Sequence, residues 1–413
     1  MTERFDIAVI GGGPAGAAVA TRGARAGAKV VVFEKGPYGR DKVCGDGLTP
    51  RAVAALEELK IPLDGAHRID GLRMIAGARV RELPWGSPER ADGGRFPIYG
   101  AVWPRRRLDA ALIDAAVESG ADVRYEHDVS SVVVDDGGRV TGVVTGNATV
   151  AADLVVLAAG PQGAVARQLG AVRDPNEPYG LAIRAYVESP RHADPLIEAC
   201  LTVKDSVGTW VPGYGWMFPC SDGTVNIGVG ALSTMKGFND LNLNTLLESY
   251  RALVRDTWAI GPNLGRPRAW RLPMSSVKRH GRGWVAIGDA AGLINPMNGE
   301  GIDYALESGM LAADLFLNDP ASAPVEYDKQ LGERFDGFLR TGRRFAFVIG
   351  HPRLMRTGLR FALGTDAVAA ITLQVMGNLV DSTTPGAAGR TMRVADRTLG
   401  LADPVLRRTR ARA

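Results

Sequence analysis

The stretch KVCGDGLTP, residues 42–50, places a cysteine where a thiol could take part in chemistry. A structural cysteine usually lies within an apolar run. Cys44 instead lies two residues after Lys42, a cation that could favour the thiolate. Gly45 and Gly47 come next, and glycines let a backbone approach a bound molecule closely. A packing role for the thiol is equally compatible with the sequence.

A glycine-rich turn near the N-terminus indicates a bound dinucleotide. Gly11, Gly13 and Gly16 follow an apolar strand-like run in G-x-G-x-x-G spacing, with Pro14 and Ala15 between the last two. The first glycine permits a tight turn, the second admits a pyrophosphate, and the third packs helix against strand. The helix that follows would offer free N–H groups to the phosphates.

An acidic residue ends the next predicted strand. That strand runs from Lys29 to Phe33, and Glu34 follows it, 18 residues beyond Gly16. A carboxylate there can accept hydrogen bonds from the adenosine ribose, and Lys35, where NADP would favour an arginine, argues against a 2′-phosphate. Strand, turn, helix, strand and acid therefore agree on a dinucleotide, with FAD and NAD both open.

The order of the predicted elements implies interleaved domains in an α/β fold. Strand-rich sequence follows the dinucleotide unit, a buried strand returns near residue 284, and the rest is mostly helical. A hairpin turn is predicted at Asp135–Gly138, and a polar helix at 239–254. We expect a Rossmann-like domain from residues 1–75, 100–175 and 275–320, an antiparallel-sheet substrate domain from 76–99 and 176–274, and a helical C-terminal region from 321–413.

Composition is that of a folded protein of the reducing cytoplasm. The 413 residues are 46% hydrophobic and 23% charged, enough for a large core. Cys44, Cys200 and Cys220 are too few and too scattered for a disulfide framework, and the five histidines show no ligand spacing, so we expect no metal. The N-terminus shows no secretory pattern, and we expect no nucleic-acid partner.

Positive charge is concentrated at the C-terminal end. Residues 331–413 contain 14 arginines and 6 acidic residues, a net charge of +8 against +4 for the whole chain. Such a region suits an anionic membrane surface or anionic ligands. A solvated basic helical face explains the same pattern.

A second motif resembles that of the FAD-dependent aromatic hydroxylases and geranylgeranyl reductases. Gly288 and Asp289 follow an apolar strand and lead into NPMNGEGI, residues 295–302. The resemblance implies a hydroxylase-type flavoprotein with FAD as cofactor, the aspartate on the ribityl side and the loop's helix aimed at the flavin pyrimidine edge. The implied cofactor-binding residues are Gly11, Gly13, Pro14, Ala15, Gly16, Glu34, Lys35, Cys44, Gly45, Arg105, Gly288, Asp289, Gly299, Gly301 and Ile302.

The stretch YGWMFP, residues 214–219, resembles the signature of the geranylgeranyl reductase family. CGDGLTPRAV, NIGVGALST and VMGNLV extend the similarity over nearly the whole chain, most closely to the mycobacterial members that act on menaquinone. The resemblance implies FAD-dependent reduction of an isolated C=C bond in a polyprenyl chain, most simply an isoprene unit of menaquinone, with a geranylgeranyl lipid as the alternative substrate. It assigns catalysis to Cys44, Tyr214 and Trp216, and substrate contact to Tyr214, Trp216 and Phe218.

Other interpretations stay open. The three aromatics share one face of a strand and could simply be sheet core. A monooxygenase or halogenase on the same scaffold is disfavoured because LAAGPQGAVARQLG lacks the hydroxylase Asp-Gly motif and the halogenase Trp-x-Trp-x-Ile-Pro is replaced. A flavin-bearing lipid carrier without turnover is a third possibility. The chain has one glycine-rich dinucleotide motif, so it identifies no electron donor.

A polyprenyl substrate would bring the enzyme to the inner face of the cell membrane. No stretch of the sequence reads as a spanning helix, so we expect at most peripheral contact through the basic C-terminal region. Residues 335–361 mix phenylalanines with arginines, as an interfacial amphipathic helix does, and Pro352 interrupts them. A helix that covers the substrate cavity would show the same mixture.

Overall fold

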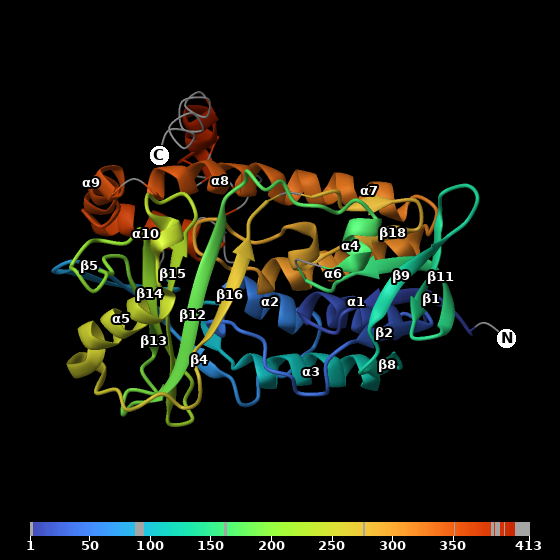
Figure 1. The fold of residues 1–413 in the computed structure, drawn as a ribbon, viewed down its shortest axis with the longest axis horizontal. Coiled ribbons are helices and arrows are strands. Elements are labelled where there is room, and N and C mark those ends of the chain that lie inside the picture. Colours follow the sequence, from blue (N-terminus) through green and yellow to red (C-terminus); the bar gives the residue numbers. More distant parts are fainter. Residues whose placement is uncertain are drawn as a thin grey trace.

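Two large sheets lie toward opposite ends of the long axis of the molecule, with helices packed along both (Figure 1). The structure is a computed structural model. It describes residues 3–86, 95–160, 163–275, 277–350, 352–380, 384, 389–391 and 393–400.

The first sheet is built around parallel strands that are buried on both faces. Its order is β17-β18-β11-β1-β2-β8, and a β9–β10 hairpin extends from the edge of β11. Apolar β-branched runs such as VVVF in β2 form such strands because no side chain reaches water. The strands are β1 (Glu3–Ile10), β2 (Val30–Glu34), β8 (Asp122–Tyr125), β9 (Val129–Val134), β10 (Val140–Thr145), β11 (Ala148–Leu157), β17 (His280–Gly281) and β18 (Trp284–Ala286).

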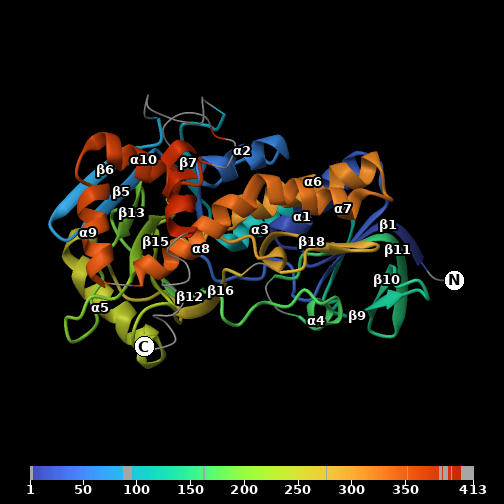
Figure 2. The ribbon, with the colours of Figure 1, turned by 90° about the horizontal axis from the view of Figure 1, so that it is seen from above.

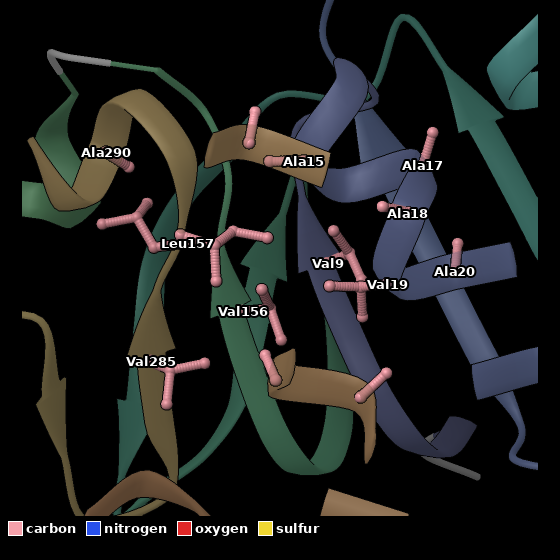
Figure 3. Packing of buried hydrophobic residues seen from close by; sticks show 14 of the residues in the cluster. Val9, Ala15, Ala17, Ala18, Val19, Ala20, Val156, Leu157, Val285 and Ala290 are labelled. Atoms are coloured by element: carbon pink, nitrogen blue, oxygen red, sulfur yellow. The ribbon is translucent and has the colours of Figure 1, made fainter. Parts of the chain in front are cut away.

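Two helices that are far apart in the chain pack together on this sheet. Val19 of α1 (Pro14–Arg25) lies against Val9 and Val156 of the sheet in the buried cluster shown in Figure 3. α6 (Ile302–Asn318) packs on α1, and a Cβ at Gly309 would stand 2.5 Å from the carbonyl oxygen of Ala15. The two helices therefore approach more closely than a side chain would allow.

The second sheet is largely antiparallel, in the order β16-β12-β15-β14-β13-β5-β6. The predicted polar helix at 239–254 is present as α5 (Leu243–Trp258). It begins later because the Asn242 side chain caps it at the Thr245 N–H, and it ends later, at Ala259 in the left-handed conformation. The strands are β5 (Gly71–Ala76), β6 (Arg79–Pro84), β12 (Tyr179–Glu188), β13 (Leu196–Cys200), β14 (Gly213–Pro219), β15 (Thr224–Leu232) and β16 (Arg268–Pro273).

Short elements connect the two sheets, so the chain crosses between them several times. They are β3 (Gly47–Leu48), β4 (His67–Ile69) and β7 (Gly100–Val102) in a small third sheet, and the helices α2 (Pro50–Glu58), α3 (Arg105–Glu118) and α4 (Ala164–Gln168). β5 joins the second sheet by pairing with β13. The division of the chain into domains at residues 75, 100, 175 and 275 stays a prediction.

The C-terminal part is helical as far as the structure describes it. The helices are α7 (Ala323–Leu331), α8 (Gly337–Ile349), α9 (Pro352–Ala362) and α10 (Asp366–Met376), and 393–400 are also helical. α9 and α10 pack against β5 and β6 in one apolar cluster, and Figure 2 shows them, in red, beyond the end of α8. Residues 401–413, with four of the arginines predicted to face a membrane, lie outside the described residues.

A buried arginine joins α2 to α6. Arg51 is 2% exposed, donates to both carboxylate oxygens of Glu307 and to the carbonyl oxygen of Asn378, and contacts the rings of Tyr304 and Phe335. A buried ion pair is costly to break because the remaining charge keeps no partner.

We therefore expect Arg51→Met to lower the free energy of unfolding by about 3–5 kcal/mol, measured by chemical denaturation. The double variant R51M/E307M should recover part of the loss, because Glu307 no longer keeps an unpaired charge, while the buried Asp303 still lacks the Arg51 charge. Lys329→Ala, which removes an exposed ion pair to Glu326, is the matched control and should leave the free energy of unfolding nearly unchanged. A similar loss in R51M and K329A would contradict this account.

Candidate functional site

A cavity of about 990 Å³ runs from the carboxyl edge of the first sheet, past β14, to the C-terminal helices. It brings together most of the site residues predicted from the sequence. Those that line it are Gly11, Gly13, Pro14, Ala15, Glu34, Lys35, Cys44, Gly45, Arg105, Tyr214, Trp216, Phe218, Asp289, Gly299, Gly301 and Ile302. Gly16 and Gly288 are not among the lining residues.

The glycine turn after β1 leaves the start of α1 open to the cavity. Gly11 has φ +106°, and a Cβ there would stand 2.6 Å from the carbonyl oxygen of Ala158. A Cβ at Gly16 would stand 2.0 Å from the carbonyl oxygen of Gly11, so this glycine closes helix against strand. Gly13 caps α1 without a side-chain hydrogen bond, which leaves N–H groups available for a phosphate.

Glu34 is held as a carboxylate at the end of β2. Its two oxygens accept the backbone N–H groups of Gly12 and Gly36, each at 2.9 Å, and Arg40 pairs with it at 3.1 Å. Burial opposes ionisation, but Arg40 and the two N–H groups hold the pKa of Glu34 below its usual value. A charged acceptor at this position suits ribose hydroxyls.

The Gly288–Asp289 motif lies next to the glycine turn at the start of α1. Gly288 has φ +53°, and a Cβ there would meet Ala15 at 3.0 Å, so this glycine lets the motif pack on α1. Asp289 pairs with Lys42 at 3.2 Å. Lys42, which the sequence offered as a cation for the thiol, is therefore engaged with Asp289.

The cysteine lies beside an arginine from a distant part of the chain. Arg105 is 4% exposed, is paired with Asp109 at 2.7 Å, and contacts the thiol of Cys44. Burial nevertheless raises the pKa of Cys44, although the Arg105 charge opposes that change. The sulfur accepts the backbone N–H of Asp46 at 3.3 Å. Cys44 thus presents a protonated thiol, not a thiolate, at the cavity wall.

Tyr214, Trp216 and Phe218 form a continuous aromatic wall along β14. Adjacent ring centroids lie 5.7 and 6.3 Å apart. The sequence predicted that Gly45 and Gly47 admit a cofactor; in the structure, Cβ atoms there would stand 3.1 and 2.9 Å from the Phe218 ring. The two glycines therefore make room for the aromatic wall, while Gly45 also lines the cavity.

Glu300 was not singled out by sequence reasoning. It precedes α6, whose N-cap residue Gly301 makes no side-chain hydrogen bond, and its carboxyl accepts the N–H of Ile302 at 3.1 Å. Burial and the neighbouring charge of Asp303 raise the pKa of Glu300 above its usual value. A neutral carboxyl therefore sits at the start of the helix that was predicted to face the flavin.

The motif VMGNLV joins this loop to the end of α10. Asn298 donates to the carbonyl oxygen of Met376 and accepts, through its own carbonyl oxygen, the Tyr214 hydroxyl at 2.6 Å. Asn378 binds Asn295 and donates to Asp303 at 2.8 Å. No role for Asn298 and Asn378 was predicted, because their partners lie about 75 residues or more away along the chain.

The far end of the cavity is roofed by apolar side chains of α8, α9 and α10. Phe335, Phe338 and Phe347 are buried in the core, and Phe345 lines the cavity. The phenylalanines of the predicted interfacial segment therefore point largely inward, as a helix covering the cavity requires. The roof consists of Phe345, Val348, Ile349, Leu354, Met355, Leu359, Ala362, Val368, Ile371, Val375 and Met376.

The structure also bears on membrane insertion and on metal binding. Among the described helices, none is both long and apolar enough to cross a membrane. Across the part of the chain that the structure describes, no group of three or more His, Cys, Asp or Glu side chains is placed to hold a metal ion. His351 lies outside the described residues.

Comparison with known proteins identifies the relatives of this chain. A family model described as "FAD binding domain" matches residues 4–315. The "Menaquinone reductase" of Mycolicibacterium smegmatis is 40% identical over 92% of this chain and 93% of its own length. The "Digeranylgeranylglycerophospholipid reductase 1" of Methanopyrus kandleri is 31% identical over 75% and 80%. The crystal structure of a geranylgeranyl bacteriochlorophyll reductase-like protein from Thermoplasma acidophilum superposes with TM-score 0.73 at 23% identity, over 95% and 96% of the chains.

The raised pKa of Glu300 predicts a dependence of stability on pH. The folded protein keeps this carboxyl protonated where the unfolded chain ionises it, so its contribution to stability is present at low pH and is lost as the pH rises through the raised pKa. Glu300→Gln stays neutral. It should match wild type near about pH 4, where the unfolded chain also keeps this carboxyl mostly protonated, and be the more stable of the two near about pH 9, measured as thermal unfolding midpoints.

The exposed Glu118 provides the control, and E118Q should follow the wild-type pH curve. A decline in E300Q as steep as that of wild type would assign the effect to another group.

Proposed function

The chain belongs to the geranylgeranyl reductase family of FAD-dependent oxidoreductases, and we propose that it saturates an isoprene unit of menaquinone. As a member of this family it carries FAD and reduces an isolated C=C bond of a polyprenyl chain. Menaquinone is proposed as the substrate because the relatives named for it match over nine-tenths of both chains.

The observation that carries the proposal is the continuity of the cavity. The two motifs assigned to FAD and the Cys44 thiol share their space with the apolar roof of α8, α9 and α10. The described residues fit the cofactor, since the open start of α1 suits a pyrophosphate and the Glu34 carboxylate suits a ribose. A prenyl chain requires the other part, a long apolar space without charge.

Positioning and exclusion of water are the main contributions of the protein. Bound reduced FAD supplies a hydride. The alkene is not conjugated to a carbonyl, so no oxyanion needs stabilising. Alignment of the reactants in a site without water therefore supplies a larger share of the rate enhancement. Tyr214 and Trp216 are fixed by hydrogen bonds to Asn298 and Asn226, at 2.6 and 3.0 Å, and so present rigid apolar faces.

The second alkene carbon needs a proton, and we assign its delivery to Cys44. The thiol lines the cavity and holds its proton because burial raises its pKa. Asp46 donates its backbone N–H to the sulfur, which stabilises the thiolate left after transfer. Tyr214 is less suited, because its hydroxyl proton is engaged by the carbonyl oxygen of Asn298.

Two other functions are compatible with the scaffold. A geranylgeranyl lipid would keep the chemistry and change only the substrate. A monooxygenase or halogenase would need the reduced cofactor to react with oxygen; the missing Asp-Gly motif and the tyrosine-led YGWMFP argue against it. The electron donor is open in all three cases.

The first experiment is mass spectrometry of menaquinone after anaerobic incubation with the chemically reduced, FAD-loaded protein. We expect a gain of about two mass units on the side chain, since one hydride and one proton are added. Cys44→Ala should bind FAD normally and turn over about 100-fold more slowly or worse, as loss of a proton donor predicts. Cys200→Ala, a buried thiol that does not line the cavity, is the control and should behave as wild type.

Saturation of a geranylgeranyl lipid in place of menaquinone would move the substrate and keep the reaction. No saturation of either lipid would overturn the proposed reaction for this chain. Full activity in C44A would overturn the role of the thiol alone.

We also propose that the protein is cytoplasmic and meets its substrate at the inner face of the cell membrane. The basic C-terminal region supports this, although Arg344 and Arg343 are paired with Asp396 and Glu177 in the structure. Sedimentation with vesicles should show binding to phosphatidylglycerol that weakens with salt, and weaker binding to phosphatidylcholine. Equal recovery in the supernatant with both lipids would contradict membrane contact.

A further inference from the structure

The residues assigned to the reaction are joined behind the cavity wall by a buried carboxylate. Asp46 is fully buried and is not among the cavity-lining residues. Its backbone has φ +69°, a conformation that glycine adopts freely and aspartate only at some cost. A side chain kept at such a position indicates that the carboxylate itself is required.

Four hydrogen bonds fix this carboxylate and its backbone. One oxygen accepts the backbone N–H of Arg105 at 3.0 Å; the other accepts the Tyr186 hydroxyl at 2.5 Å and the Asn226 side-chain amide at 2.7 Å. The carbonyl oxygen of Asp46 accepts the N–H of Trp103 at 2.9 Å. The partners come from α3, β12 and β15 and from the residue after β7, so the cysteine loop is tied to the second sheet and to α3, which packs beside β8 of the first.

Asn226 connects Asp46 to Trp216 in the aromatic wall of the cavity. Its side-chain amide nitrogen donates to Asp46 and to the carbonyl oxygen of Cys44 at 2.9 Å, and its oxygen accepts the indole N–H of Trp216 at 3.0 Å. An indole nitrogen can only donate, so the amide oxygen must face Trp216. The NH₂ group must then face Asp46, which has to supply an acceptor there.

We propose that Asp46 is a positioning residue that sets the place of the Cys44 thiol relative to the Trp216 indole. The inference rests on the proposed function for its catalytic meaning, but the geometry that it concerns does not depend on the substrate. Asp46 also holds the thiol directly, because its backbone N–H donates to the sulfur at 3.3 Å. Asp46 thus holds both Cys44 and Trp216 from outside the cavity, without contacting substrate.

The hydrogen-bond partners require an acceptor at both carboxylate oxygens of Asp46. Burial raises the pKa of Asp46 to about 6, and the hydrogen bonds from Tyr186 and Asn226 and the nearby Arg184 charge oppose a larger rise. Asparagine has nearly the same shape and would tolerate the backbone conformation. In either orientation, however, its NH₂ group would face a donor, either the Arg105 N–H or the Tyr186 hydroxyl and Asn226 amide.

The test is the rate at which iodoacetamide alkylates Cys44 in the FAD-loaded protein, followed by peptide mass spectrometry. Cys200 and Cys220, which are 2% and 1% exposed, provide internal references. Asp46→Asn should raise the Cys44 rate by about tenfold or more, the size expected when a buried charged hydrogen bond is lost. It should lower kcat more than it raises KM, because it disturbs alignment and leaves the apolar roof intact.

Matched variants separate positioning from general damage. D46N/N226A removes both ends of the same hydrogen bond and should raise the Cys44 rate no further than D46N alone. Asp136→Asn, on the exposed β9–β10 turn, removes the same charge elsewhere and should change nothing. If D46N yields no folded holoenzyme, Asn226→Ala cuts the same connection and should raise the rate alike.

Wild-type alkylation and kcat in folded D46N would overturn the inference, as would additive losses in D46N/N226A. Alkylation needs no substrate, so this failure is distinct from a failure of menaquinone reduction. A changed alkylation rate in an enzyme that ignores menaquinone would leave the positioning role standing and overturn only the substrate.

Discussion

The close contact between α1 and α6 is the constraint on which the site depends. Because residue 309 is glycine, the two helices approach until a Cβ there would stand 2.5 Å from a backbone oxygen of α1. α1 begins at the uncapped Gly13, and α6 begins after Gly301, with Glu300 accepting the Ile302 N–H, so this contact brings two helix N-termini to one cavity. The glycine turn, Asp289 and the loop before α6 can serve one cofactor only because this packing holds them together.

Local patterns predicted much of this arrangement. The glycine turn, the acid ending β2, the strand before Gly288 and the β9–β10 hairpin each depend on residues close in sequence, and the structure contains all four elements. The sequence could not predict the pairing of Arg51 with Glu307, 256 residues apart, or of Asn226 with Asp46, 180 apart. Such contacts depend on how the sheets pack against each other, and no local sequence periodicity predicts that packing.

The C-terminal helices show a second limit of pattern reading. Phenylalanine and arginine alternating on a helix describe a surface between an apolar and a polar medium, but not which apolar medium is present. In the structure, the core and the cavity take up most of this apolar face. Gly45 and Gly47 show the same limit: the sequence indicates that something approaches them closely, and the fold adds that the Phe218 ring does so, while cofactor contact at Gly45 stays a prediction.

The bonds from Asn298 to Met376 and from Asn378 to Asp303 have a consequence for long substrates. They hold the end of α10 against the start of α6, so the apolar roof keeps a fixed position relative to Cys44. The length of the cavity beneath that roof then works as a ruler along the polyprenyl chain. That length decides which double bond lies beside the thiol, because identical isoprene units offer no chemical difference.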